Sequence, residues 1–334
     1  MRRQISPEAK ARWCKGRVLT RRVSRHKSRA MKYIAIILTL TSTVSTVNAF
    51  ETDQLSNRDH VLLDSDEVIS AYFRRSIEIA RTKTQTKVDR AWERGEILSE
   101  EEIGSRFRKE LAQQNPFNFL YFGARIEGWL AKELAPQGWG FFPKYDHKDR
   151  NIYSQRFSML WGPNTGVLAL EAADLLTGSA AAPTFEVNGT RLGGDKLSHF
   201  TRLGFRYWRK SKGGDDIAKA IAYGTRSENG ILGLTGTGVF SYADLAANLA
   251  GFHFFCKLIA PGCGGGDSAD GDFFFKLEKD EGGRAMIEPV RTFLLSEFVT
   301  DDWDEYFNPN VYSKPIQKGV TAFLRRHQEA VCGE

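Results

Sequence analysis

Two stretches of the chain carry polar side chains at the four-residue spacing that places them on one face of a helix. In "GGDKLSHFTRLGFRYWRK", Asp195 and His199 share such a face. In "SYADLAANLAG", Asp244 and Asn248 are spaced in the same way. The alanines of the second stretch allow another helix to approach closely. If the two helices pack through these faces, the carboxylates, the imidazole and the amide lie within hydrogen-bonding range.

Such a set of groups suits two kinds of chemistry. A histidine oriented by a carboxylate acts as a general acid or base near neutral pH. The carboxylate and imidazole groups also suit a divalent cation, for which the ligands would be His199, Asp195 and Asp244. The stretch "SENGILGLTGTG" between the two helices adds a further acid. The candidate catalytic residues are Asp195, His199, Asp244 and Glu228, and the candidate ligand-binding residues are Asn248, Lys196 and Arg202.

The same residues also have structural explanations. Asp195 follows two glycines and is placed to cap a helix, and Ser241 with Asp244 fits the capping-box spacing. Asn248 lies inside an alanine-rich helix, where a buried amide must find partners. We therefore expect first a buried polar network that joins the helices, with no cofactor. A catalytic centre or a divalent metal site is the alternative, and whether the protein is an enzyme stays open.

The two motifs resemble those of the VanZ-like and YfiM-like families of bacterial envelope proteins, which carry a D-K-x-x-H-F helix and a later S-x-x-D-x-x-A-N-x-x-G helix. The resemblance spans residues 195–251. The matching residues are Asp195, Lys196, His199 and Phe200 in the first motif, and Ser241, Asp244, Ala247, Asn248 and Gly251 in the second. Glu228 corresponds to an acidic residue between them. The resemblance implies a polar helix pair in an exported protein associated with envelope stress and glycopeptide tolerance.

The membrane topology of VanZ-like proteins does not carry over. Those proteins are embedded in the membrane, whereas the helices here are too polar to span lipid. Their cations include Arg202, Arg206, Arg209 and Lys210.

The charges of the chain are unevenly distributed. The chain has 47 Lys and Arg against 41 Asp and Glu, a formal net charge of +6. Residues 1–49 hold 12 of the basic and 1 of the acidic residues, so the rest has 35 basic and 40 acidic side chains, a net charge of −5. The basic balance therefore does not indicate a nucleic-acid partner.

Residues 1–49 are typical of a leader with a secretory signal. Met31 and Lys32 precede the apolar run "YIAIILTL", and "VNA" ends at Ala49, which fits cleavage after that residue. We leave the start at Met1 or Met31 open. We expect export to the periplasm or the periphery of the outer membrane. There Cys256 would pair with Cys263, or Cys332 would replace either of them.

The mature chain divides into four regions. Residues 50–135 are predicted to be helical, beginning at Ser65 and again at Ser99, and residues 136–192 to hold a loop, a helix and a hairpin with an Asn188-Gly189 turn. Residues 193–260 contain the polar helix pair. Residues 261–334 are expected to hold an acidic loop and two helices, "MIEPVRTFLLSEF" and "VTAFLRRHQEAV".

These features predict a mainly α fold: a helical, bundle-like globular domain with a small β-hairpin. The sequence contains no G-x-S-x-G, H-E-x-x-H, Walker or Rossmann motif. We expect an exported envelope protein whose polar constellation serves structure or ligand binding. The alternatives are a periplasmic hydrolase, either metal-assisted or using His199 as general base, that acts on an envelope lipid or glycan, and a membrane-peripheral scaffold that uses "RYWRKSK".

Overall fold

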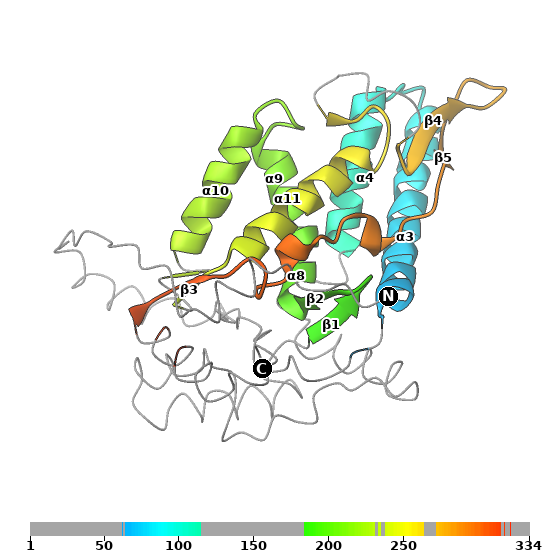
Figure 1. Cartoon of the computed structure of the whole chain (residues 1–334). Coiled ribbons are helices and arrows are strands. Elements are labelled where there is room, and N and C mark those ends of the chain that lie inside the picture. Colours follow the sequence, from blue (N-terminus) through cyan, green and yellow to red (C-terminus); the bar gives the residue numbers. More distant parts are fainter. Residues whose placement is uncertain are drawn as a thin grey trace, which may run out of the picture.

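The computed structural model describes part of the chain, and within it helices predominate (Figure 1). The strands there form two-stranded antiparallel sheets, so the mainly α prediction is confirmed for this part. The leader, His147, Cys332, the predicted helix around residues 164–178 and the final predicted helix lie outside it. The described residues are 62, 64–114, 184–230, 233–234, 238–263, 272–314, 317 and 321.

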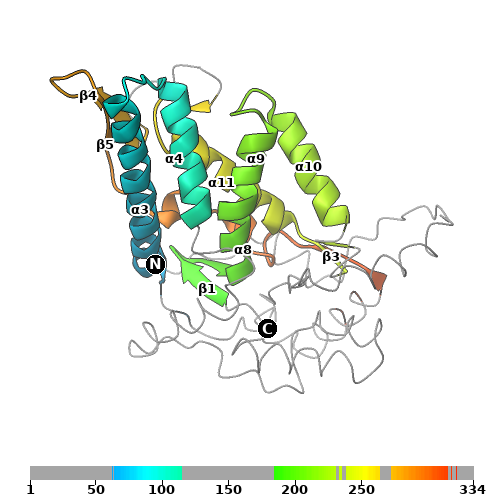
Figure 2. The same cartoon turned by 180° about the vertical axis from the view of Figure 1, so that it is seen from behind.

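The first two helices lie side by side (Figures 1 and 2). Helix α3 spans Asp66–Glu93 and buries the predicted apolar stripe, which includes Phe73. Helix α4 spans Glu100–Gln114. It begins with the predicted capping box, because the Ser99 hydroxyl accepts a hydrogen bond from the Glu102 amide and the Glu102 carboxylate accepts one from the Ser99 amide.

The predicted hairpin leads directly into the polar helix. Strands β1 (Thr184–Val187) and β2 (Thr190–Gly193) pair in antiparallel register. Asn188 and Gly189 both have positive φ, at 49° and 80°, as a type I′ turn requires. The hairpin prediction is therefore confirmed, down to its turn residues.

The helix predicted from "GGDKLSHFTRLGFRYWRK" forms without a gap, but its middle turn is a wider π-helical turn. It consists of α8 (Gly194–Ser198), the π-helical segment η2 (His199–Leu203) and α9 (Gly204–Lys210). Periodicity did not indicate the π turn, which begins at His199. Such turns occur often at functional sites.

Two further helices complete this unit, and the second of them, which carries Asp244 and Asn248, was expected. Helix α10 (Ile217–Asn229) is capped by Asp216, and α11 (Tyr242–Lys257) by Ser241. Figures 1 and 2 show α9 between α4 and α10 and next to α11. The disulfide joins Cys256 to Cys263, which is the local pairing of those considered.

The C-terminal region departs from the prediction of a helix over "MIEPVRTFLLSEF". Ala285–Pro289 instead forms strand β5, which pairs with β4 (Phe275–Lys279). Pro289 cannot continue a helix and biases its predecessor toward extended backbone. Later residues form short 3-10 turns, η4 (Leu295–Glu297) and η5 (Asp301–Trp303). Strand β6 (Val311–Tyr312) then pairs with β3 (Val239–Phe240).

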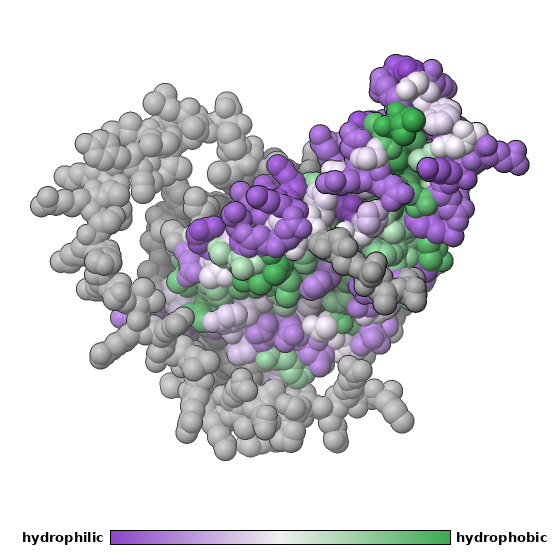
Figure 3. All heavy atoms as spheres, turned by 90° about the horizontal axis from the view of Figure 1, so that it is seen from above, coloured by the Kyte–Doolittle hydropathy of each residue, from purple (hydrophilic) through white to green (hydrophobic). Residues whose placement is uncertain are grey.

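Aromatic rings dominate the core beneath the polar helix pair. Phe200 is fully buried and its ring lies 5.2 to 5.7 Å from four others. Those neighbours, from α3, α11 and the C-terminal segment, are Phe73, Phe254, Phe298 and Trp303. Viewed from above, the described surface mixes hydrophilic residues with a strip of hydrophobic ones (Figure 3). None of the described helices is long and apolar enough to cross a membrane.

The polar helix and α11 cross at a contact between two glycines. A Cβ atom at Gly251 would lie 1.8 Å from the Phe200 carbonyl oxygen, and one at Gly204 would lie 2.6 Å from the Gly251 backbone. A side-chain rotation could not remove these overlaps, because the atoms that the added Cβ would meet belong to the main chain. The close approach therefore depends on glycine at both positions.

Replacing Gly251 with alanine should push the two helices apart. We expect the free energy of unfolding to fall by about 3 kcal/mol, since overpacking against backbone cannot relax locally. Denaturant unfolding measures the change. Gly282→Ala is the control, because its Cβ atom would come no closer than 3.4 Å to another group, and a loss of similar size there would contradict the prediction.

Candidate functional site

The centre of the site is a lysine that has no contact with solvent. The Lys196 side chain is fully buried. Its Nζ atom lies 2.7 Å from Asp195 Oδ2, 2.6 Å from Asp244 Oδ1 and 2.9 Å from Glu305 Oε1. These carboxylates come from α8, from α11 and from the segment after η5. One ammonium group thus joins three parts of the chain that are distant in sequence.

His199 lies beside this ion cluster and connects it to the middle of α11. Its Nε2 atom is 3.1 Å from Asp244 Oδ2, and its Nδ1 atom is 3.0 Å from Asn248 Oδ1. The Asn248 amide nitrogen is 3.5 Å from the Tyr207 hydroxyl. Since a carbonyl oxygen accepts, this arrangement places a proton on Nδ1 and leaves Nε2 directed at Asp244.

Local sequence explains how α11 presents these groups. The Ser241 hydroxyl accepts a hydrogen bond from the Asp244 amide, at 3.1 Å, and so fixes the first turn. The Asp244 carboxylate interacts with the Ser241 side chain and also faces Lys196 and His199. Although burial opposes its ionisation, His199 and Lys196 hold the pKa of Asp244 below its usual value.

Glu228 comes from the last turn of α10 and is completely buried. Within the described residues neither of its carboxylate oxygens makes a hydrogen bond, although the nearby Ser241 amide has a lowering effect on its pKa. Burial, and then the negative charge of Asp244, raise the pKa of Glu228 to about 9, against the opposing effect of Lys196. A carboxyl group in this state is costly and has no structural partner.

Three of these side chains could hold a metal ion. His199, Glu228 and Asp244 each offer one ligand atom, and these atoms lie within 4.8 Å of one another. Asp195 was expected in this set, but its Oδ2 atom binds Lys196 and it is not among the converging ligands. Glu228 takes its place.

Two of the predicted ligand-binding residues, Lys196 and Arg202, remain to be placed. Lys196 was expected as a ligand-binding residue and is instead surrounded by protein carboxylates. Arg202 lies half-buried in η2, where its charge interacts with Arg206 and Tyr223.

Sequence reasoning missed two members of the site. Glu305 lies in "TDDWDEYFNPN", which we interpreted only as an acidic turn, yet it is fully buried against Lys196. Burial raises its pKa to about 7, with Lys196 opposing the rise. Tyr207 lies in "RYWRKSK", where its ring was not distinguished from the solvated residues around it. A run of several acids gives no indication of which one turns inward.

Comparisons of the chain with protein-family models, with curated proteins and with solved structures found no match. They therefore leave the resemblance to VanZ-like and YfiM-like proteins untested, and it stays an expectation. What the site does must follow from its own geometry: four carboxyl groups around one ammonium and one imidazole, all shielded from water.

The pH dependence of stability should reveal the state of Glu228. Its pKa is about 9 in the folded protein and near the ordinary carboxyl value when unfolded, so the unfolded state loses its proton first as pH rises. The wild type should lose stability between these values, by at most about 1.4 kcal/mol per pH unit. Glu228→Gln should remove this slope. In chelator-treated samples, the free energy of unfolding of the variant should therefore rise relative to that of the wild type from pH 5 to pH 8. Parallel stability curves would contradict the prediction.

Removing the central ammonium group should be far more damaging than removing a surface one. Lys196→Met leaves three buried carboxylates without their cation, and we expect a loss of about 3 to 5 kcal/mol in unfolding free energy. Lys219→Met breaks an exposed pair and should cost less than about 1 kcal/mol. Equal losses in thermal or denaturant unfolding would show that Lys196 does not organise the fold.

Proposed function

We propose that the protein binds a divalent metal ion through His199, Glu228 and Asp244. The observation that carries this proposal is the fully buried carboxyl group of Glu228, which has no hydrogen-bond partner within the described residues. A buried polar group without a partner requires an explanation, and an ion that meets it in the functional protein is one. A bound cation would attract the Glu228 carboxylate and so offset the free-energy cost of burying it.

The distances support a shared ion. Ligand atoms that each lie about 2.0 to 2.2 Å from one metal are roughly 3 Å from one another. His199 Nε2 and Asp244 Oδ2 are 3.1 Å apart, and all three ligand atoms fall within 4.8 Å.

The surrounding groups orient the ligands in the way that metal sites require. Asn248 Oδ1 accepts a hydrogen bond from Nδ1 of His199, which leaves Nε2 for the ion. Lys196 holds Asp244 through Oδ1 and leaves Oδ2 directed toward His199. Two carboxylates and one imidazole suit Mn²⁺, Fe²⁺ or Zn²⁺ better than a soft cation.

A metal-assisted hydrolase is the second candidate, because three protein ligands leave a coordination position for water. A bound ion would supply activation of that water. The leader and the two helix motifs favour a bacterial protein exported to the periplasm or the outer-membrane periphery, so an envelope lipid or glycan is the substrate class. A bundle-like domain would then hold the site. The alternative is a membrane-peripheral scaffold, which would contact the membrane surface through "RYWRKSK".

Metal titration of the chelator-treated protein tests the proposal. The wild type should bind one equivalent of Mn²⁺ or Zn²⁺ by calorimetry, with a rise in Tm. Glu228→Gln should weaken binding at least tenfold, as the loss of a ligand does, while leaving the metal-free fold as stable or more so. The hydrolase candidate further requires metal-dependent cleavage of an ester or glycoside, lost in the same variant.

Glu305→Gln is the matched control. It removes the same kind of buried carboxyl group from the same cluster, but from a residue outside the three converging ligands. We expect its metal affinity to fall clearly less than that of Glu228→Gln, because Glu305 supports a ligand only through Lys196 and does not itself face the ion. Absence of binding in the wild type, or equal binding by Glu228→Gln, would refute the metal site and leave a purely structural network.

A further inference from the structure

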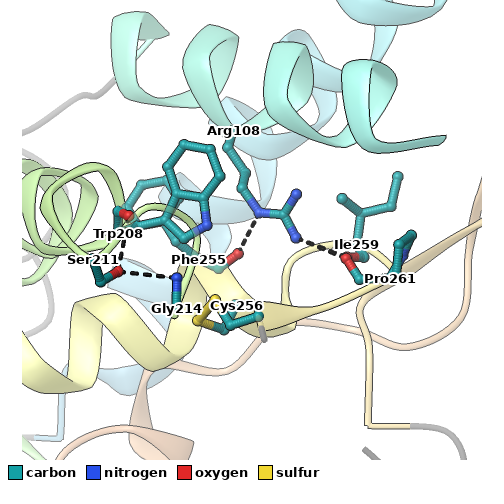
Figure 4. Close-up of a disulfide and its surroundings, with 9 residues drawn as sticks. Arg108, Trp208, Ser211, Gly214, Phe255, Cys256, Ile259 and Pro261 are labelled. Atoms are coloured by element: carbon teal, nitrogen blue, oxygen red, sulfur yellow. Dashed lines mark hydrogen bonds between the residues drawn. A yellow bond between two sulfur atoms is a disulfide. The ribbon is translucent and has the colours of Figure 1, made fainter. Parts of the chain in front are cut away.

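Arg108 of α4 is a buried cation whose hydrogen bonds, within the described residues, all go to backbone oxygens. Its side chain is 5 % exposed. Nε donates to the Phe255 carbonyl at 2.7 Å, and Nη2 donates to those of Ile259 at 2.9 Å and Pro261 at 3.3 Å (Figure 4). Within the described residues, the other terminal nitrogen, Nη1, makes no hydrogen bond. The guanidinium is therefore rigidly held with one donor group to spare.

Within the described residues, Arg108 makes no ion pair with a carboxylate. Burial lowers its pKa to about 10, and no neighbouring charge offsets that effect, so the side chain remains positive at neutral pH. A buried charge with only carbonyl dipoles around it is less favourable than one with a counter-ion. Arg108 is thus a fixed positive charge without a carboxylate partner among the described residues, whereas the raised pKa of Glu228 keeps that group uncharged at neutral pH.

Arg108 lines a cavity of about 940 Å³ between α4, α9 and the disulfide loop. This volume is within the range of small-molecule sites. The other cations of the lining are Lys109, Arg209 and Lys212, and its acids are Glu100, Glu101 and Asp215. All six of these side chains are exposed. Glu100 and Glu101 lie in the first turn of α4, where their negative charges interact favourably with the helix dipole.

Aromatic rings and a fixed loop form the rest of the wall. Phe205 and Trp208 stack with ring centroids 5.6 Å apart, and the Arg108 guanidinium carbon lies 5.3 Å from the Trp208 ring. Pro261 and Gly262 line the cavity from the loop that the Cys256–Cys263 disulfide closes. The disulfide thus holds the carbonyl groups that position Arg108.

We propose that this cavity binds the phosphate group of an organic ligand, with Nη1 of Arg108 as its fixed donor. Lys109, Arg209 and Lys212 would supply the further positive charge that a phosphate requires, and the stacked rings would contact the ligand's apolar part. A guanidinium fixed by other bonds meets a phosphate at little entropic cost. The source of the phosphate is either a small phosphate ester or a phospholipid headgroup. This site is independent of the metal proposal.

Calorimetric titration with inorganic phosphate at low ionic strength tests the anion site. We expect binding in the millimolar range, roughly 1 to 10 mM, with a rise in Tm. Arg209→Gln/Lys212→Gln changes only exposed side chains and should weaken binding about fivefold or more, by loss of charge–charge attraction. Lys276→Gln/Lys279→Gln on β4 alters net charge equally, away from the cavity, and should leave the affinity unchanged.

Arg108→Lys separates a specific site from general attraction to positive charge. It keeps the charge but loses the fixed guanidinium, so phosphate affinity should fall while circular dichroism confirms the fold. If that variant does not fold, the double variant and its control decide. No phosphate binding by the wild type, or equal weakening by the cavity and β4 double variants, would overturn the proposal.

Vesicles distinguish the two sources of phosphate. Co-sedimentation with vesicles containing phosphatidylglycerol, but not with phosphatidylcholine alone, and loss of it in the cavity double variant, would assign the site to an anionic headgroup. Phosphate binding without vesicle binding would assign it to a small phosphate ester. Vesicle binding that the cavity double variant and the β4 double variant lose alike would contradict a role for this cavity in lipid recognition.

Discussion

The ammonium group of Lys196 is the constraint on which the structure depends. A lysine without solvent contact is stable only where carboxylates surround it, and here they come from α8, α11 and the segment after η5. The need to neutralise one charge therefore brings together residues more than a hundred positions apart in the chain, since Glu305 is 109 residues from Lys196. The same contacts turn Asp244 toward His199 and so create the candidate site.

Backbone packing makes that arrangement possible. The polar helix and α11 meet at Gly204 and Gly251, where a Cβ atom on either residue would overlap the other main chain. This close approach lets short side chains such as those of Asp244 and Asn248 reach the ring of His199. The π turn that starts at His199 belongs to the same stretch, and the aromatic core around Phe200 supports it from below.

Two buried ionisable groups stand apart from this well-paired cluster. Glu228 is a carboxyl group without a hydrogen-bond partner in the described residues, and Arg108 is a guanidinium without a carboxylate there. Each lies where a ligand of opposite charge would fit, one beside the other metal-ligating groups and the other at a cavity with aromatic walls. Binding of such a ligand would offset the cost of burying each group without a partner.

Local interactions are what the sequence by itself determined. The caps at Ser99, Asp216 and Ser241, the Asn188-Gly189 turn and the limits of α10 and α11 depend on neighbours within a few residues. Spacing also indicated that His199, Asp244 and Asn248 would meet, because helical periodicity fixes which residues share a face.

Only the tertiary structure decided which acids surround them. Glu228, rather than Asp195, completes the converging ligands, and Glu305 turns inward from an acidic run whose members look alike in sequence. It also decided that residues 285–289 form a strand, since their partner strand β4 supplies the hydrogen bonds. The physical reason is common to all three: burial and charge pairing depend on segments far along the chain, which no local pattern specifies.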